Sequence, residues 1–123
     1  MPGTLDKDAL AALCREWQDR LGLAHWEIDV KLVRGVEIGN NCGQVDISTV
    51  KEQAFIRLKS PEDYHGYFPY DMEQTLVHEL LHIPMRYIVD PVDDTLEDAL
   101  TEAFIERMAR LLVRLKHEGT ERS

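Results

Sequence analysis

The chain has 123 residues, of which 44% are hydrophobic and 30% are charged, and its formal net charge is −9. This length fits one globular domain, so we expect residues 1–123 to form a single domain. The acidic balance disfavours a general nucleic-acid role, because phosphate binding relies on clustered Lys and Arg. The longest apolar runs are too short to cross a membrane, and the N-terminus lacks the basic and apolar regions of a signal peptide. We therefore expect a cytoplasmic protein without a membrane partner.

The first half of the chain predicts one helix and one strand. Residues 6–21 are predicted to form an amphipathic helix that Gly22 closes, because apolar residues recur there every three or four positions: Leu10, Leu13, Trp17 and Leu21. Alternation then predicts a strand buried on one face, with Trp26, Ile28, Val30 and Leu32 on that face. Glycine and asparagine residues between 35 and 43 indicate a flexible connection.

Two further strands are predicted between residues 44 and 59. Val45 and Ile47 share one face of the first strand, and apolar residues at 54, 56 and 58 share one face of the second. Lys51 and Glu52 are expected to lie in the hairpin connection between them. Ser60 and Pro61 end the second strand and begin a loop, 61–69, that is rich in aromatic residues.

Two helices are predicted in the second half. Asp71 is a suitable N-cap, and Gln74 occupies the capping-box position three residues later. Asp90 and Pro91 interrupt the chain, and a last helix runs from about Asp94 to near His117. This order predicts an α+β fold, with helices packed on one face of a small, mainly antiparallel three-stranded sheet.

The two cysteines and a group of arginines suggest no special site. Cys14 and Cys42 fit no zinc-ribbon or CxxC spacing, and in a reducing compartment we expect two free thiols. Arg107, Arg110 and Arg114 fall on one face of the last predicted helix, where basic residues near a helix C-terminus usually form a solvated face.

The segment "VHELLH", residues 77–82, carries the main functional signal. His78 and His82 lie four residues apart, so on a helix both imidazoles can reach one metal ion, and histidine is a good ligand for zinc. Glu79 follows the first histidine and can act as a general base toward an activated water molecule. The same string also occurs by chance in a leucine-rich core helix, where the histidines would bond to the backbone or to solvent.

A catalytic zinc ion generally takes a third protein ligand. Met85 and Ile88 exclude the pattern HExxHxxGxxH, and the last helix offers three carboxylates instead: Glu97, Glu102 and Glu106. Its main apolar face is predicted from the spacing of Phe104, Met108, Leu111, Leu112 and Leu115. Glu102 lies at the flank of this face, in line with Ala109 and Val113, where it can reach a neighbouring helix. An exposed salt-bridging role is the simpler interpretation of all three, and it is the favoured one for Glu97 and Glu106.

"VHELLH" followed by "DALTEAFIERMARLL" resembles the small gluzincin-type zinc metallopeptidases, and "WQDRLGLAHWEIDVKL" is similar to their opening helix and first strand. The likeness is greatest to short metallopeptidase-like proteins of phages and mobile elements, related to SprT-like and ImmA/IrrE-like proteins. The resemblance implies a minimal zincin-like fold that binds Zn²⁺. It makes His78, His82 and Glu102 the metal ligands and Glu79 the general base.

The resemblance also implies an edge strand beside the cleft, on which a protein or peptide substrate binds as an extended strand. Residues 54–59 are the candidate, because this predicted strand comes directly before the motif helix. A second electrophile beside zinc would stabilise the oxyanion. Five aromatic or imidazole side chains are candidates, although aromatic packing is the simpler interpretation of each: Tyr64, His65, Tyr67, Tyr70 and Tyr87.

Pro84 lies two residues after His82 and removes a helical hydrogen bond to the carbonyl of Leu80, so we expect the motif helix to bend or end there. The favoured function is that of a zinc-dependent metalloendopeptidase. One alternative is a zincin-fold binding or regulatory module with a structural or vestigial metal site, and another is a helical protein without metal. The substrate and the oligomeric state are not specified by these patterns.

Overall fold

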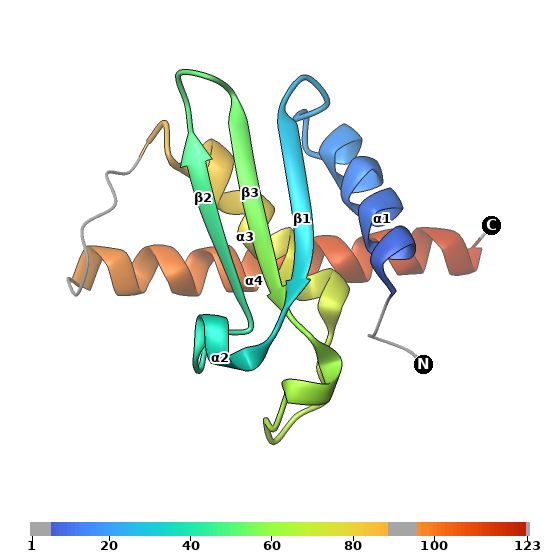
Figure 1. The fold of residues 1–123 in the computed structure, drawn as a ribbon. Helices are drawn as coiled ribbons and strands as arrows, with labels where there is room; N and C mark the ends of the chain where they lie inside the picture. The colour runs from blue at the N-terminus through green and yellow to red at the C-terminus, as the bar shows by residue number, and fades with distance from the viewer. Residues whose placement is uncertain (1–5, 89–95, 123) are drawn as a thin grey trace.

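The computed structural model describes residues 6–88 and 96–122, which form four α-helices, a short 3₁₀ helix and one three-stranded sheet (Figure 1). In chain order the elements are α1 (Lys7–Arg20), β1 (Glu27–Val33), α2 (Gly35–Ile38), β2 (Gly43–Ser48), β3 (Gln53–Lys59), η1 (Pro61–Asp63), α3 (Met72–Met85) and α4 (Leu96–Arg122). The α+β class is confirmed. The predicted interruption at Asp90 and Pro91 and the helix start at Asp94 lie outside the described residues.

Helix α1 follows the prediction closely. The side chain of Asp6 caps it by accepting a hydrogen bond from the N–H of Ala9 at 2.8 Å. Gly22, just past its end, has φ +73°, a conformation that glycine adopts without steric cost. The buried amide of Gln18 donates to two carbonyl groups of the following turn, at 3.1 and 2.9 Å. These contacts direct the chain from α1 into β1.

The sheet is mixed, with the strand order β1-β3-β2. Ile56 at its centre pairs with Val45 of β2 in antiparallel register and with Val30 of β1 in parallel register. The expectation of a mainly antiparallel sheet therefore holds for one of the two pairings. The reason is topological: residues 34–42 reverse the chain after β1, the hairpin reverses it again, and β3 inserts between the other two strands in the direction of β1.

The prediction that residues 54–59 form the edge strand is wrong. β3 is the central strand, and its backbone groups are used by β1 on one side and by β2 on the other. The edge next to α3 is β2, whereas α1 lies beside the other edge strand, β1 (Figure 1). The strand that directly precedes α3 in the sequence is thus not the strand with a free edge.

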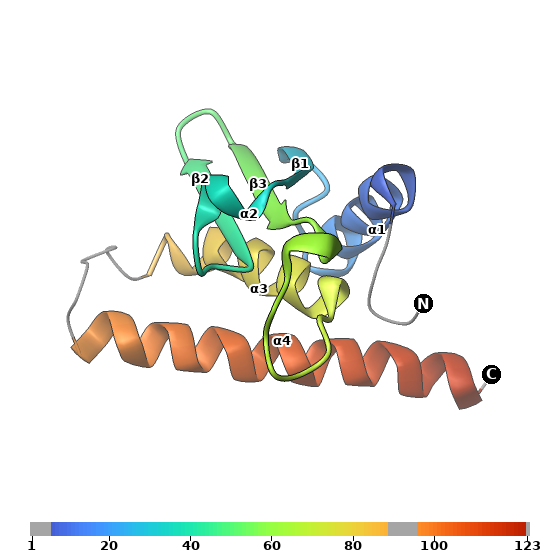
Figure 2. The ribbon, with the colours of Figure 1, turned by 60° about the horizontal axis from the view of Figure 1, so that its bottom comes forward.

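Three layers build the fold, as Figure 2 shows: the sheet, then α1 and α3, then α4 on the far side of α3. Helix α3 is enclosed between the sheet and α4, and its inward side chains are fully buried: Met72, Leu76, Val77, Leu80 and Ile83. These residues pack against Trp17 of α1 and against Ile56 and Leu58 of β3 in one hydrophobic cluster. The core therefore holds α3 from both sides, which sets the direction of its polar residues.

The apolar face predicted for the last helix is only partly the face that packs on the domain: Leu112 packs against the core, and the fully buried positions belong to a neighbouring stripe. Phe104 and Leu115 remain 52% and 51% exposed, whereas Ile105, Ala109 and Val113 are buried. The packed face of α4 thus combines Leu112 with the neighbouring Ile105, Ala109 and Val113. Glu102, Ala109 and Val113 therefore lie on the side of α4 that faces α3. The predicted position of Glu102 at the flank of the apolar face agrees with this.

The end of α3 agrees with the effect predicted for Pro84. The helix stops at Met85, one residue after the proline, and the N–H of Arg86 donates to the carbonyls of His82 and Ile83 at 3.1 and 3.2 Å. At the start, the side chain of Asp71 accepts from the N–H of Gln74 at 3.0 Å, as predicted. The motif thus occupies the regular part of a well-capped helix.

Both cysteines are free, as predicted. Burial raises the pKa of the Cys14 thiol to about 11, so this thiol stays protonated at neutral pH. The connection at 35–43, expected to be irregular, contains the short helix α2, which begins at Gly35.

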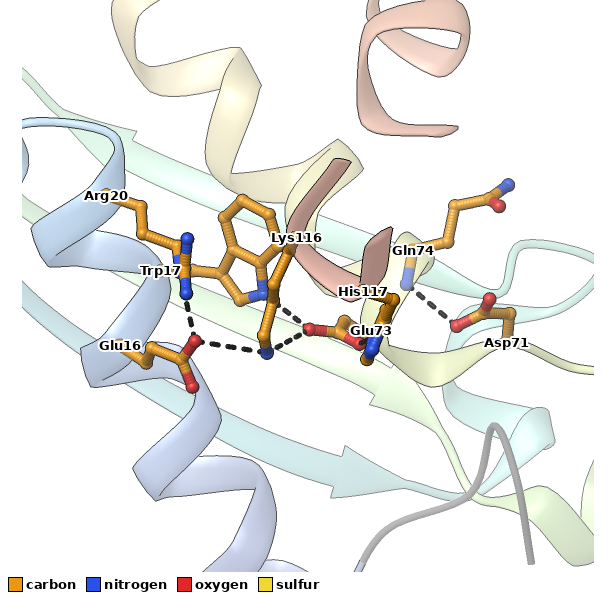
Figure 3. A network of polar contacts seen from close by, with 8 residues as sticks. All are labelled: Glu16, Trp17, Arg20, Asp71, Glu73, Gln74, Lys116 and His117. Carbon is orange, nitrogen blue, oxygen red and sulfur yellow. Dashed lines mark hydrogen bonds and ion pairs between the residues drawn. The ribbon is translucent and has the colours of Figure 1, made fainter. Parts of the chain in front are cut away.

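A polar network joins the three helices beneath the core (Figure 3). The carboxylate of Glu73 on α3 accepts from the indole N–H of Trp17 at 2.8 Å and from the ammonium of Lys116 at 2.6 Å. Its other oxygen lies 2.6 Å from His117 Nε2, and Lys116 also lies 3.1 Å from Glu16 on α1. Burial of Glu73 opposes its ionisation, but these hydrogen bonds outweigh burial and lower its pKa below the ordinary value.

Replacing Glu73 by Gln is expected to destabilise the protein by about 1.5–3 kcal/mol at neutral pH, because the side chain is only 12% exposed and its bonds are charge-assisted. A carboxyl with a lowered pKa contributes stability above its unfolded pKa and loses it as the pH falls through the folded value. The difference between the two proteins should therefore shrink below about pH 5. Urea denaturation at neutral and acidic pH measures this difference in the free energy of unfolding. The control Glu16→Gln removes a more exposed partner of Lys116 and should cost about 0–1 kcal/mol.

Candidate metal centre

The two histidines of the motif lie one turn apart on the side of α3 that faces α4. Their ring centroids are 5.3 Å apart, and both side chains are mostly buried. Leu76, Leu80 and Ile83 fill the opposite side of the helix within the core. Rotation of α3 about its axis is therefore restricted, which keeps both imidazoles directed at the same region.

Glu102 of α4 completes a three-residue cluster with these histidines. Its carboxylate oxygens lie 2.9 Å from His78 Nε2 and 2.9 Å from His82 Nε2. One potential ligand atom from each of the three residues lies within 4.8 Å of the other two. Two imidazole nitrogens and a carboxylate oxygen, converging from two helices, form a group that can bind a metal ion.

Glu106, one turn further along α4, contacts the other nitrogen of the first histidine. Its Oε1 atom lies 3.2 Å from His78 Nδ1. Its Oε2 atom lies 3.8 Å from Arg110, so the salt-bridging role favoured for Glu106 from the sequence is present. The same carboxylate also contacts His78, which was not favoured from the sequence. A carboxylate at Nδ1 fixes the ring orientation and leaves Nε2 free to bind a metal.

Glu97 does not join the cluster. It lies in the exposed first turn of α4, where its backbone carbonyl accepts a hydrogen bond from the hydroxyl of Thr101 at 2.9 Å. Of the three carboxylates that the sequence left open, the structure therefore brings Glu102 and Glu106 to the histidines and leaves Glu97 outside.

Glu79 is nearly buried, at 7% exposure. It borders a cavity of about 270 Å³ that is also lined by His78, Glu102 and Glu106. The absence of a side chain at Gly43 makes room for it, because a Cβ atom there would lie 2.9 Å from Glu79 Oε2. Burial raises the pKa of Glu79 to about 7, with Glu102 and Glu106 adding to the rise and His78 opposing it. A carboxylate with a pKa near neutrality is well matched to accepting and returning a proton.

The pKa values of the two histidines shift in opposite directions. Burial lowers the pKa of His78, but the neighbouring Glu79, Glu106 and Glu102 outweigh this effect and raise it overall. For His82, burial is the largest effect and lowers the pKa; Glu102 and Asp98 oppose it, and the positive charges of His78 and Arg86 add to the lowering. His82 therefore favours the neutral form that binds metals.

The five proposed partners for an oxyanion do not border this cavity in the part of the chain that the structure describes. The hydroxyl of Tyr70 donates to the carbonyl of Lys59 at 2.7 Å, and its ring stacks on Tyr64 with centroids 4.9 Å apart. The Tyr64 hydroxyl donates to the carbonyl of Phe68. Aromatic packing accounts for these two tyrosines, whereas Tyr67 and Tyr87 are exposed, and His65 borders a different cavity.

Three cavity residues were not predicted from the sequence to belong to the site: Asn41, Cys42 and Thr75. The first two lie in the connection before β2, which its composition described only as flexible. No local pattern of the sequence marks these two positions, because they reach the cavity only through the packing of β2 beside α3.

Comparisons with protein-family models, curated proteins and solved structures give no significant match. Within residues 6–88 and 96–122, no helix is long and apolar enough to cross a membrane. The functional argument therefore rests on the geometry of the site.

Proposed function

We propose that this protein is a zinc-dependent peptidase acting in the cytoplasm. The observation that carries the proposal is the convergence of His78, His82 and Glu102, together with a nearly buried Glu79 that lines the same cavity as His78 and Glu102. A structural site needs only ligands, whereas an ionisable carboxylate with a pKa near 7 at the same cavity is suited to moving a proton.

The three converging residues would hold the ion, and Glu106 would orient His78 through its Nδ1 atom. Zinc held there would supply Lewis-acid activation of water and of a peptide carbonyl. Glu79 would accept a proton from the attacking water as its oxygen bonds to the carbonyl carbon. The same carboxyl would then return that proton to the leaving nitrogen as the C–N bond breaks.

The edge strand β2 offers a surface for an extended substrate. β2 pairs only with β3 within the described sheet, and its first residue, Gly43, lies directly against Glu79. A peptide could bind by adding a strand to this open sheet edge. It would then pass beside Glu79. We therefore assign substrate binding to β2 in place of residues 54–59, which belong to the central strand β3.

Metal analysis combined with peptide cleavage tests the proposal. Protein purified without added metal should contain close to one zinc ion per chain, and it should cleave members of a random peptide library detected by mass spectrometry. A chelator should abolish cleavage, and stoichiometric zinc should restore it. Zinc binding without cleavage of any peptide would favour the alternative of a binding or regulatory module. Failure to take up zinc would contradict both.

A further inference from the structure

A second cavity, of about 540 Å³, lies beside α2 and the loop that follows β3. It is separate from the metal centre, although Cys42 borders both. We propose that this cavity binds an anionic oxygen group, a carboxylate or a phosphate, through an ion pair with Lys59. The inference does not depend on the proposed peptidase function.

Lys59 is held firmly in place at the end of β3. Alternation along the strand directs Leu58 into the core and Lys59 to the opposite face of the sheet. Its backbone N–H donates to the carbonyl of Cys42 at 2.8 Å, and its carbonyl accepts from Tyr70 at 2.7 Å. A Cβ atom on Gly35 would lie 3.7 Å from Lys59 Cε, so the aliphatic part of the side chain packs beneath α2.

Lys59 is only 8% exposed, yet within the described residues its ammonium group has no hydrogen bond or ion pair. The same residues contain no fully buried side-chain nitrogen or oxygen that lacks a partner, so the ammonium must keep contact with open space. Because Lys59 borders the cavity, that space is the cavity. An ammonium group that faces this cavity without a protein counter-charge would gain an ion pair from an anion bound there.

The carboxylate that lines this cavity, that of Asp63, already has partners. Asp63 accepts two hydrogen bonds from the Arg34 guanidinium, at 2.7 and 3.1 Å, and a third from the N–H of Gly35 at 3.0 Å. These bonds lower the pKa of Asp63 to about 2, so it stays ionised and paired. The lining thus carries two cations, Arg34 and Lys59, against one carboxylate, which leaves one positive charge for a ligand.

The remaining lining suits a small oxyanion. A lysine ammonium offers three N–H donors, and the side chains of Asn40 and His65 on the rim can supply further donors. Because Cys42 also borders the metal-centre cavity, the anion can be a free small molecule or a carboxylate carried by a peptide. Both sources present the same chemistry to Lys59.

The test is an NMR titration of the full-length, ¹⁵N-labelled protein at constant ionic strength. The probes are acetate, inorganic phosphate and two blocked tripeptides, Ala-Asp-Ala and Ala-Asn-Ala. We expect saturable shifts of the amide signals of Gly35 and Asn40 with at least one anionic probe, and none with the Asn peptide. Tighter binding of the Asp peptide than of acetate would assign the anion to a peptide, whereas equal or weaker binding would assign it to a free small molecule.

Lys59→Met keeps the length of the side chain and removes its charge, and it should weaken binding by about 10- to 100-fold. Lys59→Gln provides a second neutral variant should the methionine variant fail to fold. The control Lys31→Met removes a cation from the same face of the sheet outside the cavity and should leave binding unchanged. The proposal is overturned by the absence of saturable shifts with every anionic probe, or by equal affinity of the wild type and the folded Lys59 variants.

Discussion

Replacing Glu79 by Gln is expected to lower kcat for peptide cleavage by about 10²–10⁴-fold while leaving zinc bound. Gln has nearly the same shape, so it fits the space beside Gly43, but it cannot accept a proton from water. The three residues that would hold the metal are untouched, because Glu79 does not belong to the converging group.

The measurement is kcat on a peptide identified from the library, together with the zinc content of each variant. Glu97→Gln is the matched control, since it removes the same charge from an exposed position outside the cluster, and it should retain full activity. A Glu79→Gln protein that keeps both its zinc and its wild-type kcat would rule out the general-base role. Loss of zinc together with activity would instead show that Glu79 supports the metal site.

Replacing Glu102 by Ala is expected to weaken zinc binding by more than about 100-fold. Its carboxylate contacts both histidines, and residues that merely orient a ligand already contribute about 10- to 100-fold to metal affinity. Competition with a chromogenic zinc chelator measures the change, and circular dichroism verifies that each variant is folded.

Two variants on the same helix calibrate this result. Glu106→Gln should weaken zinc binding by about 10- to 100-fold, because its contact with His78 Nδ1 orients a ligand without reaching the cluster itself. Glu97→Ala should have no effect. A larger loss in Glu106→Gln than in Glu102→Ala would reverse the two roles, and a loss in Glu97→Ala would contradict the assignment of the site to this turn of α4.

The local structure of α3 could be predicted because its determinants are close in the sequence. Asp71 and Gln74 begin the helix, Pro84 ends it, and the spacing of His78 and His82 places both on one side. The α1 helix and the hairpin of β2 and β3 were predictable for the same reason, since caps, turns and alternation act over a few residues. The same local features predict two candidate metal ligands and a candidate general base without any tertiary contact.

The sequence by itself thus determined the helical spacing of the two histidines, the position of Glu79 and a short list of carboxylates. Only the tertiary structure decided which carboxylates reach them, because Ala109 and its neighbours, rather than the more apolar stripe with Phe104, pack α4 on α3. It also decided that β2, rather than β3, lies at an edge of the sheet, and that the Lys59 ammonium has no ion pair within the described residues. These outcomes depend on how distant elements pack and pair, and local patterns of hydrophobicity do not specify that choice.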